Sequence, residues 1–155
     1  MDLGVSALAT LSTGEVITGP KPHKVLLSKL QRLSRSLSSK VKGSENRKKA
    51  RLKLARLHTR ISYRRSDALH KLTTDLTSRF HTIGIEDLNV RGMVKNRHLS
   101  RAVPDMGFFE LRRQLGYKAA QRGGLIIVAD RWYPSCKTCS GCGHKLEALP
   151  LSVRE

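Results

Sequence analysis

The sequence predicts an α/β fold that carries a long helical insertion, and three observations lead to this prediction. Two short β-prone runs flank a glycine turn near the start, residues 21–81 repeat apolar side chains at helical spacing, and residues 82–129 read strand, helix, strand. A strand, a helix and a second strand in this order form a parallel crossover unit. With 155 residues, the chain is long enough for one domain with an ordinary core.

The first elements follow from the spacing of apolar residues and from the residues that interrupt it. Residues 3–18 predict a hairpin whose turn is Ser12-Thr13-Gly14. Gly43 and Ser44 then separate two helices, the second of roughly 35 residues. Because their apolar stripes can face each other, the two helices predict a helical hairpin. The first stripe consists of Leu26, Leu30, Leu33, Leu37 and Val41, and the second of Ala50, Leu54, Leu57, Ile61, Ala68, Leu72, Leu76 and Phe80.

The second half of the chain predicts the crossover unit itself. Residues 82–86 form a short buried-type strand that ends in acids, and the polar, basic residues 91–103 predict a mobile loop. Pro104 suits the first turn of a helix, which Gly123 and its neighbour close. Residues 125–129 have the length and composition of a central strand. The apolar stripe of this helix consists of Phe108, Leu111, Leu115 and Ala119.

The charge is strongly positive and concentrated. Thirty Lys and Arg oppose twelve Asp and Glu, a net charge of +18, and residues 21–65 hold sixteen of the basic residues with a single acid, Glu45. Solvated helices normally mix charges of both signs, so this run predicts a polyanion partner, DNA or RNA; a basic protein without a specific ligand is the alternative. The expected contact residues are Arg47, Lys48, Arg51, Arg56, Arg60, Arg64, Arg65, Arg97 and Arg101.

The cysteines predict a metal site in a reducing compartment. No stretch approaches a membrane span and the start lacks the features of a secretory signal, so we expect a cytoplasmic protein. Cys139-x-x-Cys142 followed by glycine is typical of a zinc-ribbon knuckle, but one pair is half a site. Cys136 and His144 could complete a strained ligand set. An iron–sulfur site or free thiols are the other readings.

Two acids stand at strand ends. Asp2 opens the first predicted strand, and Glu86 closes the strand at 82–86, with Asp87 following it. Carboxylates that converge from different strands can bind Mg²⁺, which prefers oxygen ligands, and can support phosphodiester cleavage. Such a site normally needs a third carboxylate, and strand-terminal acids also occur simply as turn or cap residues.

Three segments in order resemble the OrfB/TnpB proteins of insertion sequences. Asp2-Leu3-Gly4-Val5 resembles the first RuvC-type motif, residues 85–93 the second, and residues 130–143 the entry to the zinc-binding segment. The resemblance implies an RNase H-like (RuvC-type) fold and a metal-dependent, RNA-guided DNA endonuclease. Asp2 and Glu86 would be catalytic ligands of Mg²⁺ (or Mn²⁺), and Cys139 and Cys142 would be the first Zn²⁺ pair. The basic helices would contact the duplex of guide RNA and DNA.

The same resemblance divides the chain and marks departures. Residues 1–131 correspond to a partial RuvC-like domain with the helical-hairpin insertion at 21–81, and residues 132–155 to half of a zinc ribbon. The family also has a region before the first motif, a second Cys-x-x-Cys and a third carboxylate beyond Glu155. Cys136 stands where the family usually has serine. We therefore expect an incomplete copy that does not cut DNA alone.

Two other functions fit the same sequence. The chain could be a catalytically inactive nucleic-acid-binding remnant or regulator. It could also be a basic structural RNA-binding protein of the ribosomal kind with a zinc knuckle, although this reading leaves Asp2 and Glu86 unexplained.

Overall fold

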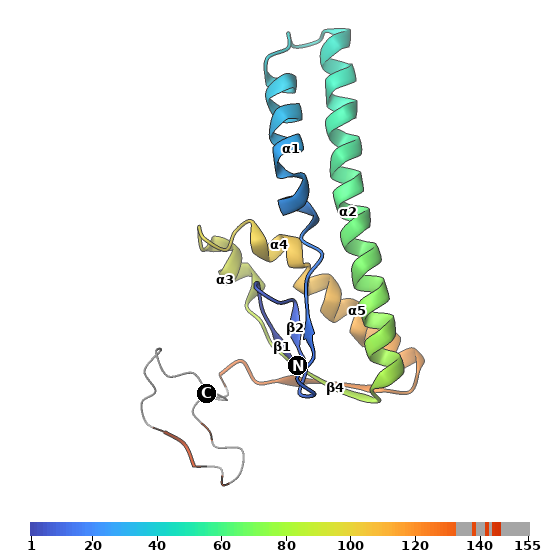
Figure 1. Ribbon diagram of the computed structural model, residues 1–155, viewed down its shortest axis with the longest axis vertical. Coiled ribbons are helices and arrows are strands. Elements are labelled where there is room, and N and C mark those ends of the chain that lie inside the picture. The colour runs from blue at the N-terminus through green and yellow to red at the C-terminus, as the bar shows by residue number, and fades with distance from the viewer. Residues whose placement is uncertain (133–137, 139–141, 143, 147–155) are drawn as a thin grey trace.

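The computed structural model consists of a helical hairpin that rises from a smaller base of short strands and helices (Figure 1). It describes residues 1–132, 138, 142 and 144–146. The predicted α/β class is confirmed, because helices and two small sheets share the described chain. Within those residues, no helix combines the length and the apolar character that crossing a membrane requires.

The first sheet is a meander of three short antiparallel strands, β1 (Asp2–Leu3), β2 (Ala9–Thr10) and β3 (Val16–Ile17). The expected hairpin over residues 3–18 is right for β2 and β3, where Gly14 has a φ of 85° and Leu11 donates to Glu15 O at 2.9 Å. The first strand of the expected hairpin is wrong, because the structure has two short strands, β1 and β2, in its place. The chain turns after Leu3, and Gly4 N–H donates to Leu8 O at 3.4 Å.

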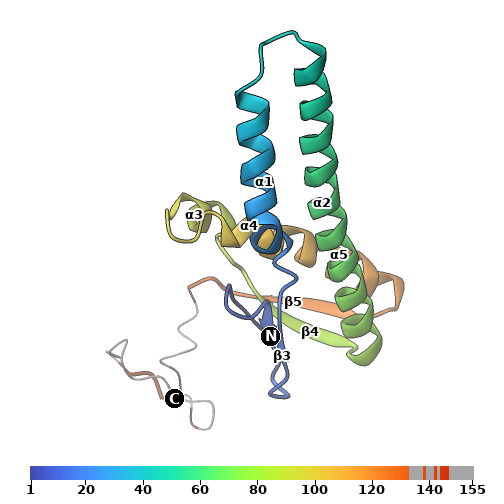
Figure 2. The same ribbon diagram turned by 45° about the horizontal axis from the view of Figure 1, so that its top comes forward.

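The helical hairpin is confirmed, with α1 (Pro22–Ser38) antiparallel to and alongside α2 (Glu45–Arg79) (Figure 2). The 35 residues of α2 correspond to a length of about 50 Å. Ser44 caps α2 as predicted, because its Oγ accepts from Arg47 N–H at 3.2 Å. Val41 does not belong to the first stripe, since α1 ends at Ser38 and Val41 is exposed.

The crossover unit is also confirmed. β4 (Thr82–Glu86) and β5 (Leu125–Ala129) pair in parallel, with Thr82 opposite Leu125 and Glu86 opposite Ala129. The expectation that residues 125–129 form a central strand is wrong for the described chain, where β5 pairs with β4 alone. Its side chains are largely exposed, including Leu125 at 56% and Ile127 at 52%.

The segment between these strands is more ordered than expected. Instead of a loop over residues 91–103, the chain forms α3 (Val90–Lys95) and α4 (Ala102–Met106). Asn89 starts α3, because its Oδ1 accepts from Gly92 N–H at 3.0 Å. Pro104 lies inside α4 and does not open the long helix. Gly107, with a φ of 69°, ends α4 before α5 (Phe108–Gln121) begins.

The core lies where the lower half of α2 meets α5 and the strands. All four residues of the predicted α5 stripe are buried. On α2, however, Leu69 and Thr73 are buried, and neither belongs to the predicted stripe. Thr73 Oγ1 lies 3.0 Å from Gln114 Oε1 in this interface. The largest fully buried apolar side chains are Leu8, Leu69, Leu76, Ile85, Met106, Leu111 and Leu115.

Two basic side chains of α5 tie this helix to α2. Lys118 Nζ donates to Thr73 Oγ1 at 2.7 Å and to His70 O at 2.8 Å, and Arg122 Nη1 donates to Thr77 Oγ1 at 3.0 Å. Burial, and then the nearby charge of Arg122, lower the pKa of Lys118. These bonds fix the helical hairpin against the base that carries the strand ends.

Candidate functional site

The structure brings Asp2 and Glu86 together at the base of the molecule. Asp2 lies on β1 and Glu86 at the end of β4, and the Met1 nitrogen donates to Gly84 O at 3.0 Å across these two strands. Glu86 lies close enough to Asp2 and to the Leu3 backbone for both to influence its pKa, so the two carboxyls are neighbours. Two acids far apart in the sequence therefore form one site.

This arrangement raises the pKa of Glu86. Burial is the largest cause, followed by the negative charge of Asp2 and the hydrogen bond between the two carboxyls. The Leu3 N–H and the positive charge at Met1 act in the opposite direction. Two carboxylates that repel each other are a fitting donor set for a hard divalent cation, which relieves this repulsion.

The described residues offer two candidate ligands for such a cation, Asp2 and Glu86. They contain no group of three or more His, Cys, Asp or Glu that could hold a metal ion. Asp130 follows β5 at the same edge of the sheet, but its Oδ1 accepts from Trp132 N–H at 2.7 Å. Asp130 therefore stabilises the turn that follows β5.

Asp87 has a different role from Glu86, although the two are adjacent. It accepts from Arg112 Nη1 at 2.7 Å and from Arg131 Nη2 at 2.6 Å, and Arg131 Nε donates to Asp87 O at 3.1 Å. The hydrogen bond from Arg112 is the largest cause that lowers the pKa of Asp87. The sequence did not predict the cluster of Asp87, Arg112 and Arg131, because the spacing of these residues along the chain follows no recognisable pattern.

A pocket of about 370 Å³ opens beside Glu86. Leu88 and Val90 are among the apolar side chains that line it, together with Phe109 from α5. Arg91, Arg112 and Arg131 contribute the positive charges of its lining. The carboxylate site thus borders a cavity whose lining combines apolar and basic side chains.

The predicted basic residues separate into two groups. Arg47 Nη1 donates to Leu37 O and Lys40 O at 3.0 Å, so it caps the end of α1, and Arg65 Nη1 donates to Pro104 O at 2.8 Å. Lys48 pairs with Glu45 at 2.6 Å. The exposed members that have no side-chain partner among the described residues are Arg51, Arg56, Arg60, Arg64, Arg97 and Arg101.

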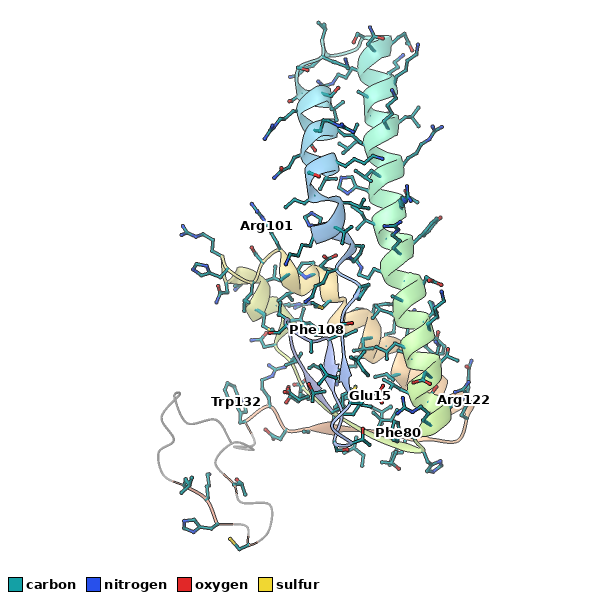
Figure 3. All side chains as sticks on the ribbon, in the orientation of Figure 1. Glu15, Phe80, Arg101, Phe108, Arg122 and Trp132 are labelled. Atoms are coloured by element: carbon teal, nitrogen blue, oxygen red, sulfur yellow. The ribbon has the colours of Figure 1, made fainter. Side chains whose placement is uncertain are left out.

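The exposed arginines come from two places in the fold. Arg51, Arg56, Arg60 and Arg64 extend along α2, whereas Arg97 and Arg101 come from the segment between α3 and α4. Figure 3 shows Arg101 beside the base of α1, and the side chains of the hairpin point outward along its length. The basic surface therefore extends from the hairpin to its base.

The predicted zinc pair lies partly outside the described residues. Cys139, like Cys136, is not among them, whereas Cys142 is described and exposed. Thr138 and Lys145 form an isolated antiparallel bridge around this segment. Zinc binding by Cys139 and Cys142 stays a prediction.

Comparison with known families agrees with the motif order. Residues 1–97 match the OrfB_IS605 family, described as "Probable transposase". The chain belongs to this OrfB family. Residues 108–155 match a second family, described as "Cas12f1-like, TNB domain". The resemblance to OrfB/TnpB proteins that the three motifs indicated is therefore confirmed.

Several curated relatives of this OrfB chain carry related names. "Putative RNA-guided DNA endonuclease" of Streptomyces pristinaespiralis is 50% identical over 155 residues, which are 100% of this chain and 39% of the relative. "Putative RNA-guided DNA endonuclease InsQ" of Escherichia coli is 39% identical over 98% of this chain and 41% of the relative. "TnpB-like protein MJ1635" of Methanocaldococcus jannaschii is 31% identical over 64% of this chain and 23% of the relative. The chain thus spans less than half the length of these relatives.

Proposed function

We propose that the chain is part of a metal-dependent, RNA-guided DNA endonuclease of the OrfB/TnpB type. The meeting of Asp2 and Glu86 from two separate strands carries this proposal. The names of the relatives supply the reaction, and the positive surface supplies the affinity for nucleic acid. In this proposal the base is a partial RuvC-type, RNase H-like domain at residues 1–131, with the hairpin at 21–81 as its insertion.

Asp2 and Glu86 are the residues that would hold Mg²⁺ or Mn²⁺. When bound, a divalent ion at such a site activates the attacking water and stabilises the leaving oxygen of a phosphodiester. The chain's own contribution is to place the carboxyls of Asp2, on β1, and Glu86, at the end of β4, next to each other. Burial, and then the charge of Asp2, raise the pKa of Glu86, and a bound cation would offset both effects.

The helical hairpin would bind the guide RNA and the DNA through their phosphates. Exposed arginines such as Arg56, Arg60 and Arg64 lack acidic partners among the described residues, so they are available to phosphate oxygens. Residues 132–155 would belong to a zinc ribbon in which Cys139 and Cys142 are two of the ligands.

A second candidate is nucleic-acid binding without cleavage, as in an inactive remnant or regulator. The basic surface favours it, because this surface needs no metal and no third carboxylate to act. The two candidates differ in one measurable property, which is metal-dependent cleavage that requires Glu86.

Metal binding and cleavage test the proposal together. Calorimetric titration with Mn²⁺ should detect a site that Glu86→Gln and Asp2→Asn weaken strongly. Glu45→Gln should leave it unchanged, since Glu45 pairs with Lys48 on the hairpin. Unchanged Mn²⁺ affinity in Glu86→Gln would contradict the metal site.

Labelled DNA is then incubated with the protein, candidate guide RNA and Mg²⁺ or Mn²⁺. Metal-dependent cleavage that Glu86→Ala abolishes would establish the endonuclease. Salt-dependent binding without any cleavage would establish the second candidate.

A further inference from the structure

We propose that the pocket beside Glu86 holds one unstacked nucleobase of a single-stranded nucleic acid. This role rests on the proposed endonuclease function, since the pocket borders the same Glu86 carboxyl. The cavity, of about 370 Å³, lies at the lower end of the size range of small-molecule sites, which suits a group as small as a base.

The apolar walls and one aromatic side chain supply the surface for a base. Leu88 and Val90 line the pocket from the β4–α3 connection, and Phe109 lines it from the first turn of α5. Phe108, its neighbour, is 3% exposed in the core, so it anchors the backbone that presents Phe109, whose side chain is 75% exposed. An exposed phenyl ring beside an apolar cavity is the usual platform on which a base stacks.

The charges around the pocket fit the phosphates that flank such a base. Arg91, Arg112 and Arg131 line it, against the two acids Glu86 and Asp87. Asp87 accepts hydrogen bonds from Arg112 and Arg131, and so it holds both guanidinium groups in place. Each guanidinium has further N–H groups, which can bond phosphate oxygens. The lining therefore combines apolar side chains with a net positive charge, which suits a nucleotide.

Trp132 adds a second aromatic ring next to this lining. It directly follows Arg131, its side chain is 85% exposed, and its N–H bond to Asp130 Oδ1 at 2.7 Å orders the backbone there. Figure 3 shows it projecting from the chain after β5, on the same lower part of the molecule as the strand ends. Stacking on rings of this kind is tolerant of base sequence, and it requires a base that is not paired inside a duplex.

Trp132 also provides the experiment, because it is the single tryptophan of the chain and directly follows Arg131, which lines the pocket. The protein is titrated without added Mg²⁺ or Mn²⁺ with a short oligothymidylate, and the quenching of Trp132 fluorescence gives the dissociation constant. Parallel titrations use the same strand with abasic positions, the same sequence as a duplex, and an RNA strand. The DNA and RNA strands show which nucleic acid the pocket prefers.

Three variants separate base stacking from general attraction to charge. Phe109→Ala should raise the dissociation constant about tenfold, the order expected when one stacked base is lost. Phe109→Tyr should preserve binding because it keeps the ring. Tyr63→Ala is the matched control, since Tyr63 is an aromatic residue of α2 with 71% exposure and should not affect the Trp132 signal. Circular dichroism checks that each variant is folded.

The expected result is quenching by the single strands, with weaker quenching by the abasic strand and by the duplex. Equal affinity for the abasic strand would overturn the proposal in favour of phosphate binding alone. Unchanged affinity in Phe109→Ala, or no quenching at all, would also overturn it. Because the titration contains no added Mg²⁺ or Mn²⁺ and measures no cleavage, its failure is distinguishable from a failure of Mn²⁺ binding at Asp2 and Glu86.

Discussion

Replacing Arg56, Arg60 and Arg64 with glutamine should make nucleic-acid binding less sensitive to salt. These three side chains are exposed, follow one another at four-residue spacing on α2, and have no acidic partner among the described residues. At 1.5 Å per residue they extend over about 12 Å of helix, and one strand of a DNA duplex carries a phosphate for about every 3.4 Å of its axis, so this length spans at least three phosphates. Each arginine can therefore meet a phosphate of its own.

The magnitude follows from counterion release. Each phosphate contact contributes about 0.9 to the slope of log affinity against log salt on duplex DNA, so three lost contacts lower the slope by about 2.7. Between about 50 and 200 mM salt, the original protein should then lose about 40-fold more affinity than the triple variant. Fluorescence anisotropy of a labelled duplex, measured at several salt concentrations, gives both slopes.

A second triple variant controls for the change in net charge. Lys71, Arg79 and Arg113 are ion-paired with acids on the protein, and replacing them with glutamine lowers the net charge by the same three units, from +18 to +15. Their positive charges are already offset locally, so the slope should change little. Equal slopes for the two triple variants would refute phosphate binding by Arg56, Arg60 and Arg64, because only the total charge would then matter.

Four substitutions test the fold and the carboxylate site. Glu86→Gln should raise the melting temperature near neutral pH, because the fold disfavours the ionised form of Glu86 and the protein loses stability as pH rises through the raised pKa. In acid, where Glu86 is protonated in both states, the gain should fade. A lower melting temperature of the variant at neutral pH would contradict this prediction. Leu115→Ala, at 0% exposure, should lower the free energy of unfolding by about 2–5 kcal/mol in denaturant titrations, and a loss under about 1 kcal/mol would disagree. Gly107→Ala should destabilise the fold, because the new Cβ would lie 2.9 Å from Leu69 Cδ1 and because the φ of +69° at this position disfavours alanine. Gly116→Ala, in open space on α5, should stabilise by about 0.5–1 kcal/mol, and equal melting temperatures would argue against this contrast.

Local sequence signals predicted the elements whose cause is local. The second helix was predicted at about its observed length because Ser44 caps it and its apolar residues recur at helical spacing. The parallel pairing of β4 and β5 followed from the strand–helix–strand order. The loop at 91–103 was not recognised as helical, since short helices such as α3 depend on a single cap at Asn89 and on the packing of a few side chains.

Periodicity located the buried face of α2 only approximately. The predicted stripe contained Ala68 and Leu72, whereas the structure buries Leu69 and Thr73 against α5. A helix repeats at 3.6 residues, so neighbouring stripes differ by a rotation that only the packing partner determines. The hydrogen bonds that Lys118 donates to α2 could not be predicted for the same reason.

The sequence by itself determined the charge, the motif order and the residue types of the site, since each depends only on identity and spacing along the chain. Tertiary structure alone decided how these residues act. It placed Asp2 beside Glu86 through the contact of β1 with β4, and it paired Asp87 with Arg112 and Arg131. Contacts between distant segments depend on how strands and helices pack and on which way each side chain points, and no local pattern records either.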